Sequence, residues 1–581
     1  MKTKIIATLG PSTESVKAIR GLILAGVNVF RINLSHGEHH QQAALIAAVK
    51  MAREQAGKET AILLDTRGPE IRTGDLKGGP LVIEKGGKLV LTSEEIESTA
   101  HRVAINYGGI VEDVKSGDRI LMDDGNLAVK VESVKGTEIH TRVLVGGKLG
   151  SRKRVSLPGV VVNLPPLTEK DVEDIRFGVR AEVDFIAASF VRKGEDVLAV
   201  RKVLEEVGGS QQVISKIENQ ESVDNLEEIL ELSDGLMIAR GDLGVELEPE
   251  TVPIIQKKII RLANQMGKPV ITATQMLESM INSPRPTRAE SSDVANAILD
   301  GTDAVMLSGE TAVGSYPEQA VRFLVKNGRV SEADLPYDDL LAKGGRYSTQ
   351  TMTNSICYAS CAIANDLAAA AILTATQSGL TARMVSRHRP RTRIIAMSPS
   401  AVTRRRMQLY WGVTPFEAND GDSIDSLFDN SIEAAKEKNL LHNGDLVVIT
   451  AGLPFRSSGS TNMLRIQAIG DIDLHGQGIG TKRVTGRVVI VHGQEDLARV
   501  KSGDIIVCYE TDTSMVAPLN RVGGVITEQP GLTCHAALVG RELDIPVITG
   551  VKNASVKLKE GQTITMDCKY GQIKAFAPKD D

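Results

Sequence analysis

The stretch Gln212-Val213-Ile214-Ser215-Lys216-Ile217-Glu218-Asn219 has the pattern that decides the fold: a short apolar run that ends in polar and charged side chains. The pattern recurs through the first half of the chain, each time before a stretch of helical character. Apolar runs that alternate with helices are typical of a parallel sheet buried on both faces. Eight such units in this span predict a (β/α)8 barrel. The runs are Ile5–Thr8, Val27–Asn33, Ala61–Asp65, Asp184–Ala188, Gln212–Lys216, Gly235–Ala239, Pro269–Thr272 and Ala304–Leu307.

The length of 581 residues, at ~150 residues per domain, suggests about four domains. Residues 71–167 are rich in glycine, short alternating runs and Gly-Gly or Asp-Gly turns, which predicts a small β-barrel domain inserted into the large barrel. The large barrel is therefore expected to comprise residues 1–70 and 168–343. Residues 344–470 read as a further α/β domain. Residues 471–581 read as an appended β-rich domain of the swivelling type.

Composition and charge argue against several classes of partner. The chain has 68 Lys+Arg and 73 Asp+Glu, a net charge of −5, which gives no electrostatic footprint for nucleic acid. No apolar stretch is long enough to span a bilayer, and the first residues do not resemble a secretory leader. The five cysteines form an odd and sparse set, which favours reduced thiols over disulfides. We expect a cytoplasmic protein with neither nucleic acid nor membrane as a partner.

Three charged residues follow two consecutive strands of the expected barrel. Alternation along the extended chain places Lys216 and Glu218 on one side, and Asp242 follows the next strand. The carboxyl ends of barrel strands are where active sites of this fold lie. Glu218 and Asp242 can hold one hard divalent cation through oxygen and leave positions for water and substrate. The alternative is a salt bridge between Lys216 and one of the two acids.

A second polar cluster follows two earlier strands. Arg31, Asn33 and Ser35 share one face of their segment, and Asp65 and Thr66 end the next strand. Arg31 offers a planar fork suited to phosphate or carboxylate. The oxygens of the other four residues fit a weakly held monovalent cation, and they fit a hydrogen-bonded network equally well.

Two motifs in the second half suit phosphate chemistry. Hydroxyls and backbone N–H groups in Thr376–Thr381 follow an apolar run and precede an expected helix, where an anion can bind. An ordinary capped helix explains the same residues. His535 opens another expected helix, where it can be a phosphoryl carrier or a cap.

Taken together, these motifs resemble the pyruvate kinase family. The resemblance covers about residues 1–470 and rests on several independent motifs in the same order. They are Thr8-Leu9-Gly10-Pro11-Ser12, Arg31-Ile32-Asn33-Leu34-Ser35-His36-Gly37, Asp65-Thr66-Arg67-Gly68-Pro69-Glu70-Ile71-Arg72, Ile214-Ser215-Lys216-Ile217-Glu218-Asn219, Ala239-Arg240-Gly241-Asp242-Leu243-Gly244, Ser283–Ala297 and Met306-Leu307-Ser308-Gly309-Glu310-Thr311-Ala312.

The resemblance implies transfer of the phosphoryl group of phosphoenolpyruvate to ADP, which gives pyruvate and ATP in glycolysis. It implies that Lys216 stabilises the transferring phosphoryl group and that Arg31 holds the phosphate of the substrate. The Gly241 backbone and the Thr274 hydroxyl would contact the substrate carboxylate, beside Asp242. Thr274 would lie near the path by which enolpyruvate is protonated, as one link of a relay, because a free hydroxyl is a poor acid at neutral pH.

The resemblance also implies two cation sites and a nucleotide site. Glu218 and Asp242 would hold Mg2+ or Mn2+. The family's K+-independent members carry Lys where this chain has Glu70, so a requirement for K+ is expected. The K+ ligands would be Asn33, Ser35, Asp65 and Thr66. The residues that face the nucleotide phosphates would be His36, Arg72 and Lys153.

One nucleotide motif departs from the family pattern. Lys153-Arg154-Val155-Ser156-Leu157-Pro158-Gly159 stands where the family usually reads Lys-Gly-Val-Asn-Leu-Pro-Gly. The family further implies a homotetramer under allosteric control by a phosphorylated effector, either a sugar phosphate or a nucleoside monophosphate. Its anion would bind at Thr376, Ser378, Gly379 and Thr381.

Residues 471–581 resemble the mobile phosphohistidine domain of phosphoenolpyruvate-using synthetases and dikinases. That domain usually reads Thr-Ser-His-Ala-Ala, and this chain has Thr533-Cys534-His535-Ala536-Ala537. A dikinase-like enzyme with His535 as carrier is one alternative, but the sequence contains no evident ATP-grasp region. A metabolite sensor with an inactive barrel is another, but Lys216, Glu218 and Asp242 are all present. We expect the tail to be structural or regulatory.

Overall fold

The structure is a computed structural model. It describes residues 1–76, 79–346, 351–417, 424–442, 445–452, 461–469 and 473–575.

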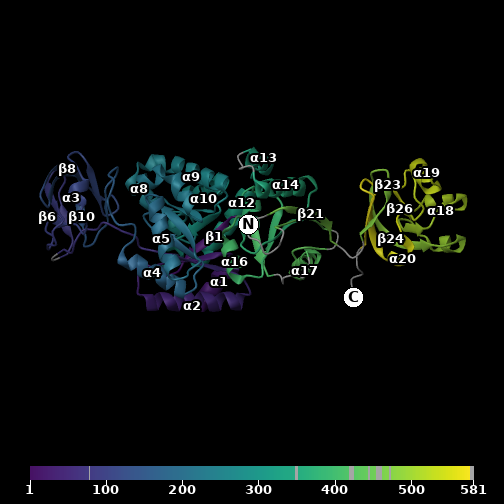
Figure 1. Ribbon diagram of the computed structural model, residues 1–581, viewed down its shortest axis with the longest axis horizontal. Coiled ribbons are helices and arrows are strands. Elements are labelled where there is room, and N and C mark those ends of the chain that lie inside the picture. The colour runs from purple at the N-terminus through teal and green to yellow at the C-terminus, as the bar shows by residue number, and fades with distance from the viewer. Residues whose placement is uncertain are drawn as a thin grey trace. The chain divides into compact units, whose positions relative to one another are not determined.

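Eight parallel strands close into a barrel in the order β1-β16-β15-β14-β13-β12-β3-β2, which confirms the predicted fold class (Figure 1). Each strand is short and apolar, and almost every residue in it is buried, as expected for a sheet covered on both faces. The strands are β1 (Lys4–Thr8), β2 (Val29–Asn33), β3 (Ala61–Asp65), β12 (Phe185–Ala188), β13 (Gln212–Ile217), β14 (Gly235–Ala239), β15 (Val270–Ala273) and β16 (Ala304–Leu307).

Helices surround these strands and bury their apolar faces in one hydrophobic core. Several begin with a side-chain cap: Thr168 and Thr287 each accept a hydrogen bond from the backbone of the third helical residue, which satisfies an otherwise free N–H group. The helices are α1 (Val16–Ala25), α2 (His39–Ala56), α4 (Glu169–Arg180), α5 (Gly194–Glu206), α6 (Gln220–Asp224), α7 (Leu226–Leu232), α8 (Arg240–Glu246), α9 (Val252–Met266), α10 (Arg288–Asp300), α11 (Gly309–Ala312), α12 (Pro317–Ala333) and α13 (Tyr337–Arg346).

A small β domain interrupts the barrel between β3 and β12. Its main sheet has the order β11-β7-β8-β9-β5-β6, with a separate β4–β10 pair, and it has its own apolar core. Its elements are β4 (Leu81–Ile83), β5 (Lys88–Thr92), β6 (Arg102–Ala104), α3 (Ile110–Asp113), β7 (Arg119–Met122), β8 (Leu127–Lys135), β9 (Glu138–Val145), β10 (Gly147–Leu149) and β11 (Val155–Ser156).

An α/β domain follows the barrel and contains a five-stranded sheet. The chain divides into two compact units, and the division passes through this domain. Its elements are α14 (Met352–Asp366), β17 (Ala371–Ala375), α15 (Leu380–Ser386), β18 (Arg393–Met397), α16 (Ala401–Arg406), β19 (Val413–Phe416), α17 (Ile424–Glu437), β20 (Leu446–Ala451) and β21 (Met463–Ala468).

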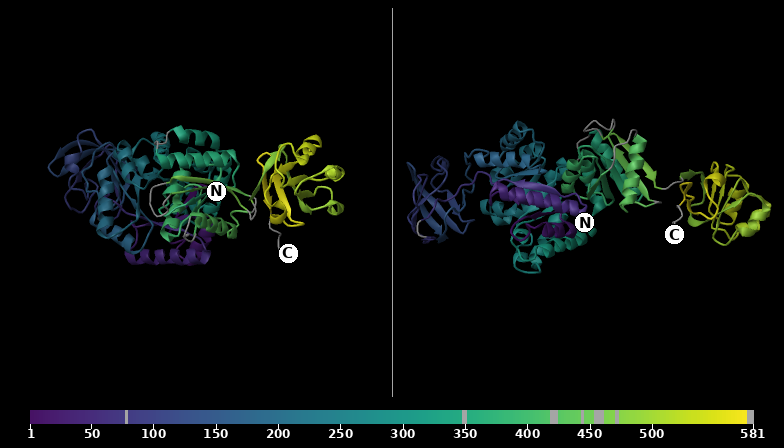
Figure 2. Two further views of the ribbon diagram at one scale, coloured as in Figure 1. Left: turned by 45° about the vertical axis from the view of Figure 1, so that its right-hand side comes forward. Right: turned by 90° about the horizontal axis from the view of Figure 1, so that it is seen from below.

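The C-terminal domain has an eight-stranded mixed sheet with helices beside it (Figure 2). Val488 and Val489 of β24 belong to different apolar clusters, because successive strand residues point to opposite faces. Both faces are therefore covered. Its elements are β22 (Asp473–His475), β23 (Gln477–Ile479), β24 (Arg483–Val491), β25 (Ile505–Cys508), α18 (Val516–Leu519), β26 (Gly524–Thr527), α19 (His535–Glu542), β27 (Val547–Thr549), α20 (Ala554–Lys557), β28 (Thr563–Asp567) and β29 (Gln572–Ala575).

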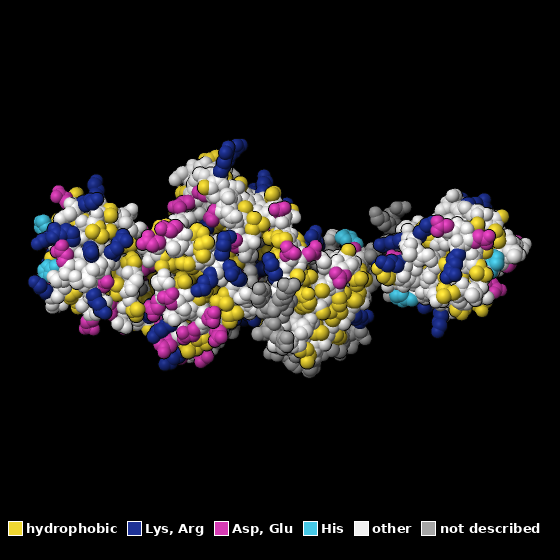
Figure 3. Space-filling model, turned by 90° about the horizontal axis from the view of Figure 1, so that it is seen from above, with side chains coloured by type: hydrophobic (Ala, Val, Ile, Leu, Met, Phe, Trp, Pro, Cys, Tyr) yellow, Lys and Arg dark blue, Asp and Glu magenta, His cyan; other side chains and the backbone are white. Residues whose placement is uncertain are grey.

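The surface carries both signs of charge. On the face that Figure 3 presents, Lys and Arg side chains are interspersed with Asp and Glu. Among the described helices, none has the length and apolar character that crossing a membrane requires.

Candidate active site

The carboxyl ends of the barrel strands gather the buried charged side chains. Lys216 lies on β13, Glu218 follows that strand, and Asp242 lies in the first turn of α8, directly after β14. Glu218 is fully buried, and Lys216 is 8% exposed. Charges at such depth are stable only when they are paired, so the contacts of these groups decide their chemistry.

Lys216 lies among three oxygen atoms. Its Nζ is 3.0 Å from Oε1 of Glu218 and 3.3 Å from Oδ1 of Asp65, and it donates a hydrogen bond of 2.8 Å to Oγ of Ser189. Burial by itself lowers the pKa of an ammonium group, but Asp65 and Glu218 outweigh that effect and raise the pKa of Lys216. Lys216 is therefore a fixed positive charge at neutral pH.

Glu218 and Asp242 form the acidic part of the site. Oε2 of Glu218 accepts a hydrogen bond of 2.6 Å from the backbone N–H of Phe190, and its buried Oε1 faces Nζ of Lys216 at 3.0 Å. Burial, opposed by Lys216 and reinforced by Asp242, raises the pKa of Glu218 to about 7. Burial acts on Asp242 as well, but Arg154 and Lys216 lower its pKa overall.

These two carboxylates fit a divalent cation. Hard cations prefer oxygen ligands, and Glu218 and Asp242 supply carboxylate oxygens directly after two neighbouring strands, β13 and β14. No group of three or more His, Cys, Asp or Glu side chains suited to a metal occurs in the described part of the chain. A cation here would therefore need ligands beyond protein carboxylates, such as water or substrate oxygen.

Arg31 of β2 pairs with the buried Asp65, which ends β3. Nε of Arg31 donates to Oδ2 of Asp65 at 2.6 Å, and NH1 lies 3.2 Å from Oγ1 of Thr8. Burial raises the pKa of Asp65, but Lys216 and Arg31 more than reverse this, so its pKa is lowered. Asp65 thus fixes the position of two cationic side chains at the mouth of the barrel.

The four residues expected to bind K+ come from these same two strand ends. Asn33 and Asp65 are paired in register between β2 and β3. Oδ1 of Asn33 accepts from the Ser35 backbone N–H at 3.1 Å, and the Thr66 hydroxyl donates to the Ala187 carbonyl at 3.3 Å. These hydrogen bonds engage part of the oxygen set, and a K+ site at the same four residues stays a prediction.

Gly241 and Thr274 are brought together as expected of neighbouring strand ends. The Gly241 N–H donates to Oγ1 of Thr274 at 2.8 Å, and that hydroxyl donates to the Ala273 carbonyl at 2.7 Å. Thr274 has φ of +63°, a left-handed conformation that costs a non-glycine residue about 1–3 kcal/mol. The Arg240 guanidinium holds the Thr274 carbonyl at 2.6 Å and pairs with Asp293 at 2.7 Å, which maintains this backbone.

The structure places the expected nucleotide residues in two groups. Arg72 and Lys153 lie in the inserted domain on adjacent segments, since the Thr73 N–H donates to the Lys153 carbonyl at 2.8 Å. Arg72 pairs with Glu70 at 2.6 Å, and Lys153 pairs with Asp123 at 2.6 Å. His36 belongs to the barrel, where it is exposed on the loop after β2.

The expected effector residues are partly engaged. The Thr376 hydroxyl accepts from the Gly379 N–H at 3.0 Å, and the Thr381 hydroxyl lies 2.9 Å from that of Thr461. Ser378 is exposed, and Gly379 has φ of +84°, which favours glycine.

In the C-terminal domain, His535 begins α19, and Cys534 is its N-cap without a side-chain cap hydrogen bond. Nδ1 of His535 lies 2.8 Å from Oγ1 of Thr511. This hydrogen bond orients the imidazole ring through Nδ1, and the ring's second nitrogen, Nε2, takes no part in it.

Sequence reasoning missed two contacts to the charged cluster. Ser189 follows β12 and bridges Lys216 and Asp65, so the strand-end rule that selected Lys216 could have found it. Arg154 of the inserted domain is in direct ionic contact with Asp242. The sequence did contain a sign of it: Arg154 stands where the family motif usually has glycine.

Comparisons with known proteins agree with this geometry. Family models match residues 1–321 (pyruvate kinase, barrel domain), 354–467 (pyruvate kinase, alpha/beta domain) and 500–571 (PEP-utilising enzyme, mobile domain). The chain is 47% identical over 577 residues to a pyruvate kinase of Geobacillus stearothermophilus, with 98% of each chain covered. Those of Sporosarcina psychrophila and Staphylococcus haemolyticus are 46% and 45% identical over 576 residues, again with 98% of each chain covered. The chain belongs to the pyruvate kinase family of phosphotransferases.

Proposed function

We propose that this enzyme transfers the phosphoryl group of phosphoenolpyruvate to ADP and releases pyruvate and ATP. The observation that carries the proposal is the permanently charged Lys216, buried beside two carboxylates at the carboxyl end of the barrel. Transfer of a phosphoryl group needs positioned positive charge where negative charge spreads in the transition state. The full-length similarity to proteins named pyruvate kinase supports this assignment.

Glu218 and Asp242 would hold the divalent cation, Mg2+ or Mn2+. When bound, the cation would neutralise charge on the carboxylate and phosphate oxygens of the substrate. Lys216 would supply a second, fixed positive charge beside Glu218. Ser189 and Asp65 keep its ammonium group in place, so little reorganisation is needed during the reaction.

Arg31 would bind the phosphate of phosphoenolpyruvate, because it lies at the strand end with its guanidinium oriented by Asp65. The substrate carboxylate would be received by the Gly241 N–H and the Thr274 hydroxyl, which bond to each other at 2.8 Å here. Substrate binding would replace that bond. The strained backbone of Thr274 keeps the hydroxyl in a position to serve as one link in the relay that protonates enolpyruvate.

The nucleotide phosphates would be bound by Arg72 and Lys153 from the inserted domain and by His36 from the barrel. The two basic side chains pair with Glu70 and Asp123 in this structure, so nucleotide phosphates would compete with those carboxylates. K+ would bind among Asn33, Ser35, Asp65 and Thr66 and supply the positive charge that a chain with Glu70 lacks.

We place the allosteric site at Thr376–Thr381 of a homotetramer, where a sugar phosphate or nucleoside monophosphate would bind. Ser378 is exposed and accessible to such an anion. Ser378→Ala and Thr381→Ala should together abolish activation and spare basal turnover. The Thr381 hydroxyl already bonds to Thr461, so Ser378→Ala alone is the cleaner variant.

The C-terminal domain would be structural or regulatory. The residues proposed above for direct transfer to ADP all lie in the barrel and the inserted domain, and Cys534 stands where the resembling domain usually has serine beside its histidine. A cytoplasmic location is consistent with the five cysteines, all of which are free thiols.

The test is a coupled assay of pyruvate release with purified enzyme, with and without ADP, Mg2+ and K+. Pyruvate should form only when ADP and a divalent cation are both present, with one ATP for each pyruvate. Formation of AMP and phosphate would instead favour a dikinase-type reaction.

A further inference from the structure

Arg154 is a buried cation that the proposed roles leave unexplained. It precedes β11 in the inserted domain, and its side chain is 12% exposed. Its NH1 contacts Oδ1 of Asp242, and its guanidinium carbon lies 4.9 Å from the centre of the Phe190 ring. It stands where the family motif usually has glycine, so this contact is a feature of this chain.

Three carboxylates surround the guanidinium. Burial opposes the charged form, but Asp242, Glu218 and Glu246 more than compensate and raise the pKa of Arg154. Arg154 is therefore always charged. It occupies one oxygen of the carboxylate that the proposed metal site needs.

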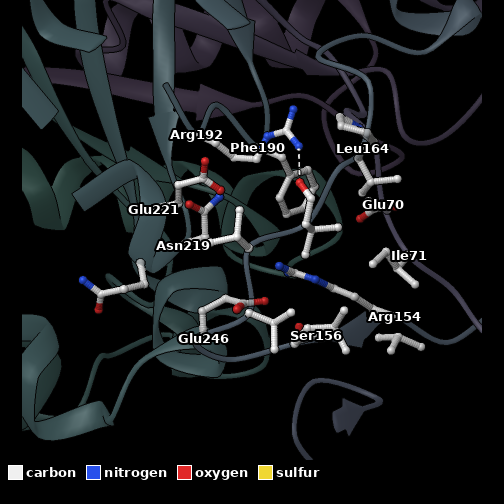
Figure 4. Close-up of a pocket in the computed structure, with 18 of the residues that line it drawn as sticks. Glu70, Ile71, Arg154, Ser156, Leu164, Phe190, Arg192, Asn219, Glu221 and Glu246 are labelled. Carbon is white, nitrogen blue, oxygen red and sulfur yellow. Dashed lines mark hydrogen bonds between the residues drawn. The ribbon is translucent and has the colours of Figure 1, made fainter. Parts of the chain in front are cut away.

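There is space beside this contact for the side chain to move. A cavity of about 180 Å³ adjoins Arg154, and its lining includes Glu70, Glu221 and Glu246. Figure 4 shows the Arg154 side chain extending between Phe190 and Glu246. Glu246 is half-buried, and burial raises its pKa even though Ser156 and Arg154 act in the opposite direction. A guanidinium that left Asp242 would therefore have a second carboxylate within its reach.

The inference rests on the divalent-cation site proposed at Glu218 and Asp242. We propose that Arg154 is an internal competitor for that site: it holds Asp242 when no metal is bound, and a divalent cation binds only when the guanidinium moves from Asp242 toward Glu246. Arg154 thereby sets the metal affinity of the free enzyme. Because Arg154 belongs to the inserted domain, metal binding also changes how that domain is held to the barrel.

The physical reason is charge. With Lys216 and Arg154 both in place, two cations already face Glu218 and Asp242, and a divalent ion added to them meets strong like-charge repulsion. Moving Arg154 to Glu246 frees an oxygen ligand and increases the distance between the two positive charges. The energy of the Arg154–Asp242 pair is subtracted from that of metal binding.

The experiment measures Mn2+ binding directly, by the electron paramagnetic resonance signal of free Mn2+, in full-length enzyme without substrate or nucleotide. Arg154→Leu removes the charge and keeps the bulk of the side chain. It should tighten Mn2+ binding at least about tenfold, which corresponds to about 1.4 kcal/mol. Arg154→Lys keeps a charge but loses the planar contact with Phe190, and its dissociation constant should lie between the two.

Arg152→Leu is the matched control. It removes the same charge two residues earlier, where Arg152 pairs with Asp75 at 2.8 Å and both side chains are mostly exposed. Its Mn2+ dissociation constant should equal that of the parent enzyme. A change equal to that of Arg154→Leu would overturn the inference, since it would reflect net charge alone.

Glu246→Gln tests the second position of the guanidinium. In the parent enzyme it should weaken Mn2+ binding about threefold, as expected when a partly exposed ion pair is lost. In the Arg154→Leu background it should have no effect. An equal effect in both backgrounds would contradict the movement toward Glu246.

Failure of the metal site and failure of this inference are distinguishable. If Asp242→Asn leaves Mn2+ binding unchanged, the proposed site is wrong, and the inference is wrong with it. If Asp242→Asn abolishes binding while Arg154→Leu leaves it unchanged or weaker, the metal site is right and the competition by Arg154 is refuted.

Discussion

Replacing Lys216 by methionine should separate catalysis from stability. The substitution removes one fixed charge from the proposed phosphoryl-transfer site and replaces the side chain by an unbranched one that is one heavy atom shorter. Loss of one preorganised charge contact to a transition state costs about 3–4 kcal/mol, so turnover should fall by about 100- to 1000-fold or more. The measurement is turnover at saturating phosphoenolpyruvate, ADP and Mg2+.

The structure predicts a much smaller effect on folding. Asp65 keeps its contact with Arg31 at 2.6 Å, so it is not left as an isolated charge. Burial raises the pKa of Glu218 to about 7, so this carboxyl group can take up a proton near neutral pH when Lys216 is lost, at a cost of about 1 kcal/mol or less. The lost hydrogen bond to Ser189 adds about 1 kcal/mol. The midpoint of thermal unfolding should therefore fall by only a few degrees.

The loss of stability caused by Lys216→Met should depend on pH in a definite direction. The pKa of Glu218 is raised on folding, so its stabilising contribution is present at low pH and is lost as the pH rises toward about 7. Lys216 stabilises only the ionised form of Glu218. Lys216→Met should therefore lower the unfolding midpoint more at pH 8 than at pH 6.

Lys50→Met is the control, because Lys50 is a surface residue that pairs with Glu182 at 2.8 Å. It should leave turnover unchanged. A folded Lys216→Met enzyme with near-normal turnover would refute the assigned role. A larger stability loss at pH 6 than at pH 8 would refute the electrostatic reasoning.

Four further predictions concern the metal ligands, the K+ requirement, His388 and the C-terminal domain. Glu218→Gln and Asp242→Asn each remove a charged oxygen ligand and should shift Mg2+ activation to higher concentrations, so an unchanged titration in both would rule out the site. Activity should require K+, which full turnover in rigorously K+-free buffer would contradict. Burial and Arg387 lower the pKa of His388 to about 3, so His388 destabilises the fold progressively as the pH falls below about 6.5; His388→Phe should flatten the fall of the unfolding midpoint between pH 7 and pH 5, and identical slopes would argue against this. Removal of residues after 470, or His535→Ala, should leave turnover within about tenfold of the parent, a change of only ~1.4 kcal/mol, whereas loss beyond a hundredfold in folded protein would restore the carrier role of His535.

The barrel was predictable because its signal is local and repeated. Each strand is a short apolar run that ends in polar residues, and closure in a parallel barrel follows from eight such units. The strand-end rule also predicts which residues share the active-site end. Lys216, Asp65 and Arg31 meet there although they lie far apart in sequence.

The individual pairings were not predictable by that rule. Sequence analysis left open whether the second cluster binds a cation or forms hydrogen bonds, because both use the same oxygens. The structure has the Asn33–Ser35 and Thr66–Ala187 bonds, which a cation would have to replace in part. Whether these oxygens bind a cation or only each other depends on the free energy of ion hydration as much as on geometry. The identities of the side chains alone do not give that free energy.

Contacts made by residues of the inserted domain are harder to predict from sequence, because the barrel does not determine where those residues lie. A strand-end residue is placed by the barrel itself, whereas Arg154 reaches Asp242 across 88 positions of sequence from a domain with its own sheet and core. No period or spacing in the barrel motifs encodes that contact. What the sequence does contain is a mismatch: a charged, bulky residue where the family motif usually has glycine. A cation beside the acidic residues Glu218 and Asp242 must either pair with a carboxylate or stay in water, and a mostly buried position makes pairing favourable. A substitution of this kind in the inserted domain can therefore change metal affinity without any change in the barrel residues. We expect members of one enzyme family to differ in metal affinity at such positions.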